Sequence, residues 1–150
     1  MEYQQYKIRE LSYIDYHNKY LELLQQHFTI VPSDISIQSF TEFVKSLGLN
    51  HQIFVIEKVI EERTIIIGSI TVIIEQKLIR SMGKVAHIEE MITHEDYRGQ
   101  HIAKQLLNHV KEYARQNACY KVSLNCKPNM VRFYERNEFM NNGNQMVIYL

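Results

Sequence analysis

The N-terminal third of the chain repeats its apolar residues at the spacing of helices. Within residues 14–27, apolar and aromatic side chains recur three and four positions apart, and residues 40–47 repeat that spacing just before Gly48. Residues at this spacing share one face of a helix, so each segment is predicted to be a helix with one buried side. Glycine often ends a helix, and Gly48 is expected to cap the second one. Helices are therefore expected first.

The middle of the chain has the composition of strands. Residues 52–59 and 64–75 are rich in isoleucine and valine and are separated by the charged turn 61–63, which predicts an antiparallel hairpin. After a short break at residues 77–80, a third strand is predicted at residues 85–93.

The last third alternates between the two patterns. It predicts a long helix from Ile102, a strand at 120–125, a helix at 130–137 and a final strand at 145–149. The whole order indicates an α+β fold, with a mixed and mostly antiparallel sheet flanked by helices.

Composition narrows the class of protein. The 150 residues are 45% hydrophobic, which fits one domain, residues 1–150, with a substantial core. Lys plus Arg equal Asp plus Glu at 17 each, and the basic residues are scattered, so neither nucleic acid nor a membrane surface is an expected partner. Residues 1–20 lack a secretion-signal pattern, and no apolar run reaches the length of a membrane span. We expect a cytoplasmic protein that binds a small molecule.

Cysteines and histidines give no sign of a metal site. Cys119 and Cys126 flank the predicted strand 120–125, which would hold their Cα atoms roughly 20 Å apart, too far for a disulfide. Both are interpreted as buried small hydrophobes. Histidine pairs lack metal-ligand spacing with a carboxylate, so no metal is expected.

The segment 97–107 carries the strongest candidate chemistry. It is a polar loop that contains Gly99 and runs directly into the long amphipathic helix. Backbone N–H groups at the start of a helix bind anions, so a pyrophosphate is expected here. The loop is neither the dinucleotide fingerprint, which needs a second glycine at His101, nor a P-loop. An ordinary strand-to-helix turn with a solvated Arg98 would also explain the loop taken alone.

The loop resembles the acyl-CoA-binding signature of the GNAT N-acetyltransferases, read on Arg98, Gly99, His101 and Ala103. The order of predicted elements is also similar to that superfamily. Four further blocks resemble the glucosamine 6-phosphate N-acetyltransferases: residues 74–79, 87–90, 119–126 and 129–136. The resemblance implies a GNAT fold and a homodimer that shares its active sites. It also implies acetyl transfer from acetyl-CoA to glucosamine 6-phosphate in a ternary complex, on the way to UDP-N-acetylglucosamine.

The resemblance also assigns catalytic roles. The strand that carries residues 89–92 is expected to separate from the next strand, so that a backbone N–H can stabilise the oxyanion. Tyr134 matches a tyrosine that protonates the CoA sulfur, although a core aromatic beside Phe133 is the alternative. Glu89 and Glu90 match an acidic pair near the sugar amine. Because strand neighbours face opposite sides, at most one carboxylate should face the substrate. Glu89 is favoured for a backbone contact and Glu90 for its carboxylate.

Further binding residues follow from the matched blocks. Residues expected to contact acetyl-CoA are Met91, Ile92, Thr93, Arg98, Gly99, Gln100, His101, Ile102, Ala103, Lys104, Asn125 and Tyr134. Residues expected to contact the sugar phosphate are Thr29, Lys77, Leu78, Ile79, Arg80, Glu89, Glu90, Tyr120, Lys121 and Arg132. Each single Lys or Arg has the alternative of an ordinary surface charge.

Four positions depart from the family pattern. His101 replaces a frequent glycine, which is tolerated if its φ is negative. Asn125 replaces a common carboxylate, so it keeps hydrogen bonding but loses charge. Glu138 replaces the glycine of a turn, at the cost of a left-handed cap. Tyr149 stands where a basic residue often touches substrate.

Two alternatives remain at the level of sequence. The chain could be another GNAT enzyme that acetylates a polyamine, an amino sugar or a protein amine. It could also be a non-catalytic acetyl-CoA-binding sensor. His87 and His94 bracket the strand 85–93, but no histidine base is required if the sugar amine titrates near neutral pH.

Overall fold

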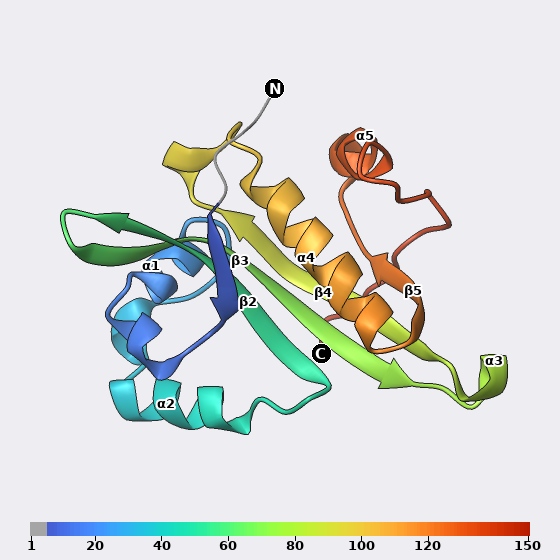
Figure 1. Cartoon of the computed structure of the whole chain (residues 1–150), viewed down its shortest axis with the longest axis horizontal. Helices are drawn as coiled ribbons and strands as arrows, with labels where there is room; N and C mark the ends of the chain where they lie inside the picture. The colour runs from blue at the N-terminus through green and yellow to red at the C-terminus, as the bar shows by residue number, and fades with distance from the viewer. Residues whose placement is uncertain (1–5) are drawn as a thin grey trace.

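A five-stranded sheet in the order β1-β2-β3-β4-β5 forms the centre of the computed structural model, which describes residues 6–150 (Figure 1). The strands are β1 (Lys7–Glu10), β2 (His51–Ile60), β3 (Arg63–Gln76), β4 (Lys84–Thr93) and β5 (Cys119–Leu124). The helices are α1 (Tyr20–Gln25), α2 (Ile37–Ser46), α3 (Ile79–Met82), α4 (Ile102–Gln116) and α5 (Val131–Glu135). Short 3-10 turns are η1 (Tyr13–Tyr16), η2 (Pro32–Asp34), η3 (Glu95–Tyr97) and η4 (Pro128–Met130).

The sheet is mixed, as the sequence predicts. Strands β1 to β4 pair in antiparallel fashion, whereas β5 runs parallel to β4. A parallel neighbour needs a crossover, and α4 supplies it between β4 and β5. The predicted α+β fold class is confirmed.

Two apolar layers cover the sheet, one on each face (Figure 1). On one face, α4 packs its buried residues Leu106, Leu107 and Val110 against β2, β3 and β4. On the other face, α1 and α2 cover a second cluster that includes Leu23 and Phe40. The amphipathic patterns seen in the sequence therefore belong to helices that each bury one side.

The β2–β3 hairpin is confirmed, with Glu61 and Glu62 as its two-residue loop. Both residues have positive φ, 47° and 64°. A loop with two left-handed residues matches the twist of the flanking strands, although side chains other than glycine or asparagine are uncommon there.

The N-terminal region differs from the prediction. The expected helix at 14–27 is broken into η1 and α1, because Lys19 has a φ of 65°, which a helix cannot continue through. The second helix ends without a glycine cap: its C-cap is the extended Leu47, so the expected role of Gly48 is wrong. Strand β1 precedes the helices and was not predicted, since four residues are too few to show a period.

The expected final strand at 145–149 is also absent from the described fold. Residues 140–150 form no helix or strand, and their apolar side chains are exposed, with Ile148 at 81% and Tyr149 at 91%. A strand exists only beside a partner strand, and this segment pairs with none within the described chain.

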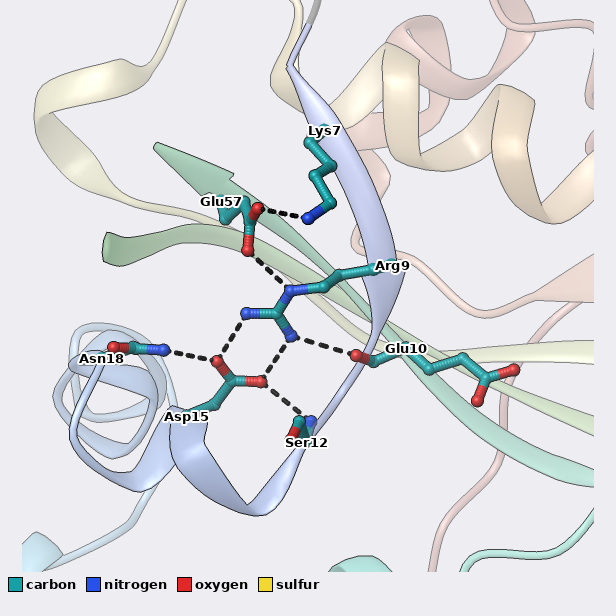
Figure 2. A network of polar contacts seen from close by, with 7 residues as sticks. All are labelled: Lys7, Arg9, Glu10, Ser12, Asp15, Asn18 and Glu57. Carbon is teal, nitrogen blue, oxygen red and sulfur yellow. Dashed lines mark hydrogen bonds and ion pairs between the residues drawn. The ribbon is translucent and has the colours of Figure 1, made fainter. Parts of the chain in front are cut away.

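A buried ion-pair network fastens β1 to the rest of the domain (Figure 2). The carboxylate of the fully buried Asp15 accepts hydrogen bonds from Arg9 Nη1 at 2.8 Å and Nη2 at 2.7 Å. Arg9 Nε also donates to Glu57 of β2 at 2.6 Å. Asn18 Nδ2 and the Ser12 N–H donate to the same Asp15 carboxylate. Burial opposes ionisation of this carboxyl, but the hydrogen bonds outweigh it and lower the pKa of Asp15.

Candidate active site

A large cleft opens where β4 and β5 separate. Their paired register ends at Ile88 and Leu124, while β4 continues to Thr93. The cleft has a volume of about 970 Å³ and is lined by this end of β4, the loop before α4, the start of α4, the segment after β5, and α5. The separation that the resemblance implies is therefore present, and it leaves one edge of β4 without a neighbouring strand.

A β-bulge places both acidic residues of β4 in this cleft. Glu89 pairs with Thr71, but the register shifts before Ile92 pairs with Ser69. Glu90 lies in the bulge with a φ of 43°, and both glutamates are exposed and line the cleft. Strand alternation is broken at a bulge, so the expectation that only one carboxylate could face the substrate does not apply. The Thr71 hydroxyl lies 3.5 Å from Glu90 Oε2.

The polar loop before α4 has the shape of an anion cradle. Gly99 has a φ of 77°, and α4 begins at Ile102 on the wall of the cleft. The first N–H groups of a helix have no partner within the helix and point outward along its axis. His101 has a φ of 61°, so the condition of a negative φ is not met. A left-handed conformation costs a side chain about 1–2 kcal/mol, and here it forms the turn into α4.

The residues expected to contact acetyl-CoA come together at this cleft, with one exception. Those that line it are Met91, Ile92, Thr93, Arg98, Gly99, His101, Ile102, Ala103, Lys104, Asn125 and Tyr134. Gln100 is not among the lining residues. Its side chain accepts a hydrogen bond from the Tyr6 hydroxyl at 3.3 Å and donates to the Asp96 carbonyl at 3.5 Å.

Tyr134 lies on α5 and combines packing with exposure to the cleft. Its ring meets Phe133 and Phe139 edge to face, with centroids 5.0 Å and 5.8 Å away. Burial, with a smaller contribution from Cys126, raises the pKa of the Tyr134 phenol. A phenol with a raised pKa remains protonated at neutral pH and can act as a hydrogen-bond donor. The two interpretations of Tyr134, packing and site residue, are therefore compatible.

The positive charges of the cleft are only partly those expected from the sequence. Arg98 and Lys104 line it, and so do Lys127 and Arg136, which the sequence analysis did not select. Arg132, which was selected, is exposed on α5 and is not among the lining residues. Arg136 ends one of the matched blocks, two residues after Tyr134, and that position was the available signal.

The remaining expected phosphate contacts gather at the opposite end of the sheet. Arg80 Cζ lies 5.5 Å from the centre of the Tyr120 ring, and Lys121 Nζ lies 5.9 Å from it. Lys77 Nζ pairs with Glu75 at 2.7 Å. Lys121 is beside Val85 in the register. That point is four residues, roughly 13 Å, along β4 from the cleft at Glu89. Leu78 and Ile79 are exposed at the start of α3, which lies at the same tip (Figure 1).

Thr29 lies in a separate, largely apolar cavity of about 440 Å³ between α1, α2 and the sheet. Glu90 and Phe28 line both this cavity and the large cleft, so the two spaces meet at the β4 bulge. Thr29 is therefore near the acidic pair but outside the large cleft.

The cysteines are unpaired, as expected, but only partly buried. Cys119 has intermediate exposure and Cys126 is exposed at the cleft, so the expectation that both are buried is wrong. Within residues 6–150, no group of three or more His, Cys, Asp or Glu side chains is arranged to hold a metal ion. In the same residues, none of the helices has the length and apolar character needed to cross a bilayer.

Comparison with known proteins agrees with this architecture. Residues 13–139 match the acetyltransferase (GNAT) family. A glucosamine 6-phosphate N-acetyltransferase of Candida albicans is 33% identical to this chain, and the match covers 96% of this chain and 95% of the Candida protein. That of Arabidopsis thaliana has a crystal structure with a TM-score of 0.88, at 30% identity over 97% of this chain and 99% of that one. The crystal structure of a Trypanosoma brucei acetyltransferase has a TM-score of 0.87 at 27% identity, and the match covers 97% of this chain and 100% of the Trypanosoma chain.

The fold and the cleft thus define an acyltransferase of the GNAT class, which confirms the expected fold. The chain belongs to the acetyltransferase (GNAT) family and, within it, to the glucosamine 6-phosphate N-acetyltransferases.

Proposed function

We propose that this protein transfers the acetyl group of acetyl-CoA to the amine of D-glucosamine 6-phosphate by direct attack in a ternary complex. The product is N-acetyl-D-glucosamine 6-phosphate, a precursor of UDP-N-acetylglucosamine. The observation that carries the proposal is the cleft itself. It brings together the polar loop before α4, the unpaired edge of β4, two carboxylates and a half-buried phenol around one cavity. The names and coverage of the relatives support the same activity.

The loop and the start of α4 would bind the pyrophosphate of acetyl-CoA. Helix N–H groups and the cations Arg98 and Lys104 are suited to a doubly charged anion. The pantetheine arm would then follow the open edge of β4 past Thr93 and Met91. This arrangement delivers the thioester toward Glu89 and Glu90, where the bulge turns the backbone outward.

The chemistry requires three contributions from the chain. A backbone N–H on the open edge of β4 would donate to the thioester oxygen as negative charge develops there. Glu90, close to the Thr71 hydroxyl, would attract and orient the amine of the sugar. Tyr134 would donate its phenolic proton to the departing sulfur, since its raised pKa keeps that proton in place until a thiolate forms.

The position of the sugar phosphate favours a homodimer with shared sites. Arg80, Tyr120 and Lys121 are too far along the sheet to meet a hexose phosphate held at Glu89 of the same chain. The same residues on a second copy could reach it. The exposed apolar segment 145–149 supports such an assembly, because an unpaired extended segment can add to the sheet edge of a neighbour.

The setting of the reaction is proposed to be the cytoplasm. Cys119 and Cys126 are free thiols, which is typical of a reducing compartment. Balanced charge, 17 basic against 17 acidic residues, supports a small-molecule substrate rather than nucleic acid or a membrane surface.

The deciding experiment measures release of the CoA thiol by the purified protein with acetyl-CoA and one amine at a time. Glucosamine 6-phosphate is compared with glucosamine, glucosamine 1-phosphate and spermidine. Release with the 6-phosphate alone is expected. Activity on an unphosphorylated amine would replace the proposal with a different GNAT acceptor. Binding of acetyl-CoA without turnover of any amine would indicate a sensor.

A further inference from the structure

Three strands hold Ser123, His87 and Glu75 in one hydrogen-bonded chain. His87 Nδ1 lies 3.1 Å from Ser123 Oγ, and His87 Nε2 lies 2.8 Å from Glu75 Oε2. The three residues come from β5, β4 and β3, so the fold rather than the local sequence brings them together. The sequence analysis gave His87 no role.

Glu75 determines which way the hydrogen bonds among these three residues run. A carboxylate can only accept a hydrogen bond, so the neutral imidazole carries its proton on Nε2 and donates it to Glu75. Nδ1 is then the unprotonated nitrogen, and it accepts from the Ser123 hydroxyl. This is the order of an acid, a histidine and a hydroxyl in which the histidine takes up a proton and the carboxylate stabilises the resulting imidazolium.

The three hydrogen-bonded residues lie beside the cleft and are accessible to solvent. His87 pairs with Ser123, and the next pair, Ile88 with Leu124, is the last before β4 and β5 separate. Ile88 and Leu124 both line the cleft. Two residues further on from His87 is Glu89, about 7 Å along the strand. The side chain of His87 is 36% exposed and that of Glu75 is 45% exposed, so α1 and α2 do not cover this part of the face.

We propose that Ser123, His87 and Glu75 form a proton relay that accepts the proton which the acceptor ammonium must lose before it attacks the thioester. The inference rests on the proposed acetyl transfer and adds residues that accept the proton of the acceptor ammonium. Asn125, which directly follows β5, cannot take up a proton in this role because an amide is not a base at neutral pH.

The protons balance over the reaction. The ammonium gives one proton to Ser123 Oγ, directly or through water, as Ser123 passes its own proton to His87 Nδ1. The free amine then forms the C–N bond to the acetyl carbon, and the C–S bond breaks. Tyr134 donates its phenolic proton to the departing sulfur, which gives the CoA thiol. The second amine proton, lost as the amide forms, restores the Tyr134 phenol directly or through water. His87 returns the first proton to water after the product leaves.

Charged groups around His87 come from each neighbouring strand. β3 contributes Glu75, and Lys77, which follows the end of β3, places its Nζ 2.7 Å from Glu75 Oε1. β4 contributes Glu89, and β5 contributes Lys121, two residues before Ser123. On β2, His51 lies beyond Ile73, the residue paired with His87. Of these charged groups, Glu75 is the one in direct contact with the imidazole, at 2.8 Å.

The test compares His87→Gln with the wild-type protein across pH. Glutamine can keep hydrogen bonds to Ser123 and Glu75 but cannot take up a proton. At about pH 7, where an ordinary imidazole is mostly neutral and much of the sugar amine is still protonated, kcat/KM should fall about tenfold; at about pH 9, where the amine is free, it should fall by less than about 3-fold. Ser123→Ala should show the same dependence on pH. The exposed His17, changed to Gln, is the matched control and should leave the rate unchanged.

The outcomes separate the relay from the proposed function. If His87→Gln lowers kcat/KM equally at every pH, or does not lower it at all, the relay is overturned. The proposed function still stands in that case if the wild type acetylates glucosamine 6-phosphate. If the wild type acetylates a different amine, the function is overturned and the same rate ratio on that amine decides the relay. The thermal unfolding temperature of His87→Gln and its affinity for acetyl-CoA should match those of the wild type. A change in either would show a folding defect.

Discussion

Gly68 of β3 lies directly beneath Ile102, the first residue of α4. A Cβ placed on Gly68 would be 2.7 Å from Ile102 Cγ2 and 3.3 Å from Leu106 Cδ1, and both of those residues are buried. The helix that begins at the anion loop therefore rests on a position where only glycine fits. The height of α4 above the sheet, and with it the position of the loop, depends on this contact.

Gly68→Ala is expected to destabilise the protein and weaken acetyl-CoA binding together. Overpacking of this kind costs about 1–3 kcal/mol, and the clash would displace the start of α4. Urea unfolding measures the first effect and isothermal titration calorimetry the second. Gly48→Ala is the matched control, because nothing lies within 4 Å of its added Cβ. Equal behaviour of the two variants would disprove the packing argument.

Tyr134→Phe should reduce kcat by roughly 10- to 1,000-fold, the effect of losing one acid or hydrogen-bond donor. Its affinity for acetyl-CoA should not change, because the ring still packs on Phe133 and Phe139. Steady-state kinetics and direct titration test both statements. Tyr113→Phe removes a hydroxyl that donates to the Leu49 carbonyl, so it controls for the loss of a phenol elsewhere. An undiminished kcat would remove Tyr134 from the mechanism.

Arg136→Ala should raise the KM for one of the two substrates about tenfold, which is the scale of one charged hydrogen bond. Arg136 lines the cleft, whereas Arg115 is an exposed residue on α4 that pairs with Glu112 at 3.5 Å. Arg115→Ala is therefore the control. Arg132→Ala tests the expectation made from sequence. A larger effect at Arg132 than at Arg136 would mean that the site extends beyond the cleft of one chain.

The Asp15 network should make stability depend on pH in the acid range. Because the folded pKa of Asp15 lies below its ordinary value of 3.8, its contribution is complete above that value and is lost as the pH falls through the folded pKa. Asp15→Asn removes the charge that pairs with Arg9 Nη1 and Nη2, while Glu57 still pairs with Arg9 Nε, so it should cost about 1.5–3 kcal/mol at neutral pH, the scale of a hydrogen bond to a charged group. Urea unfolding between about pH 7 and pH 2 measures this cost. The variant should show a shallower loss on acidification, and parallel curves would contradict the assignment.

Ile148→Asp should convert a dimer into a monomer and reduce activity with it. A charge on the exposed apolar segment 145–149 opposes its burial against a second copy. Light scattering after size-exclusion chromatography reports the mass, and CoA release reports the activity. Asn141→Asp, also exposed, adds the same charge outside the apolar stretch. A wild-type protein that is monomeric yet fully active would exclude the shared site.

Much of the fold and of the CoA side of the site could be predicted from the sequence. Segments rich in isoleucine and valine predicted β2 and β3, the apolar stretch at residues 85–93 predicted β4, and helical spacing predicted α2 and α4, because each of these elements is long enough to show its pattern. The loop at 97–107 could be recognised since its glycine and the following helix are contiguous. In contrast, β1 is too short to show a pattern, and the break at Lys19 depends on a local φ that composition does not reveal.

The sequence by itself determined the class of fold, the family resemblance and the polar loop that leads into α4, all of which depend on neighbours along the chain. Only the tertiary structure decided which distant residues meet. It put Arg136 in the cleft and Arg132 outside it, and it gave both Glu89 and Glu90 access through the bulge. It also joined Ser123, His87 and Glu75 across three strands. The reason is that strand register and bulges depend on pairing between segments far apart in the chain, which no local pattern records.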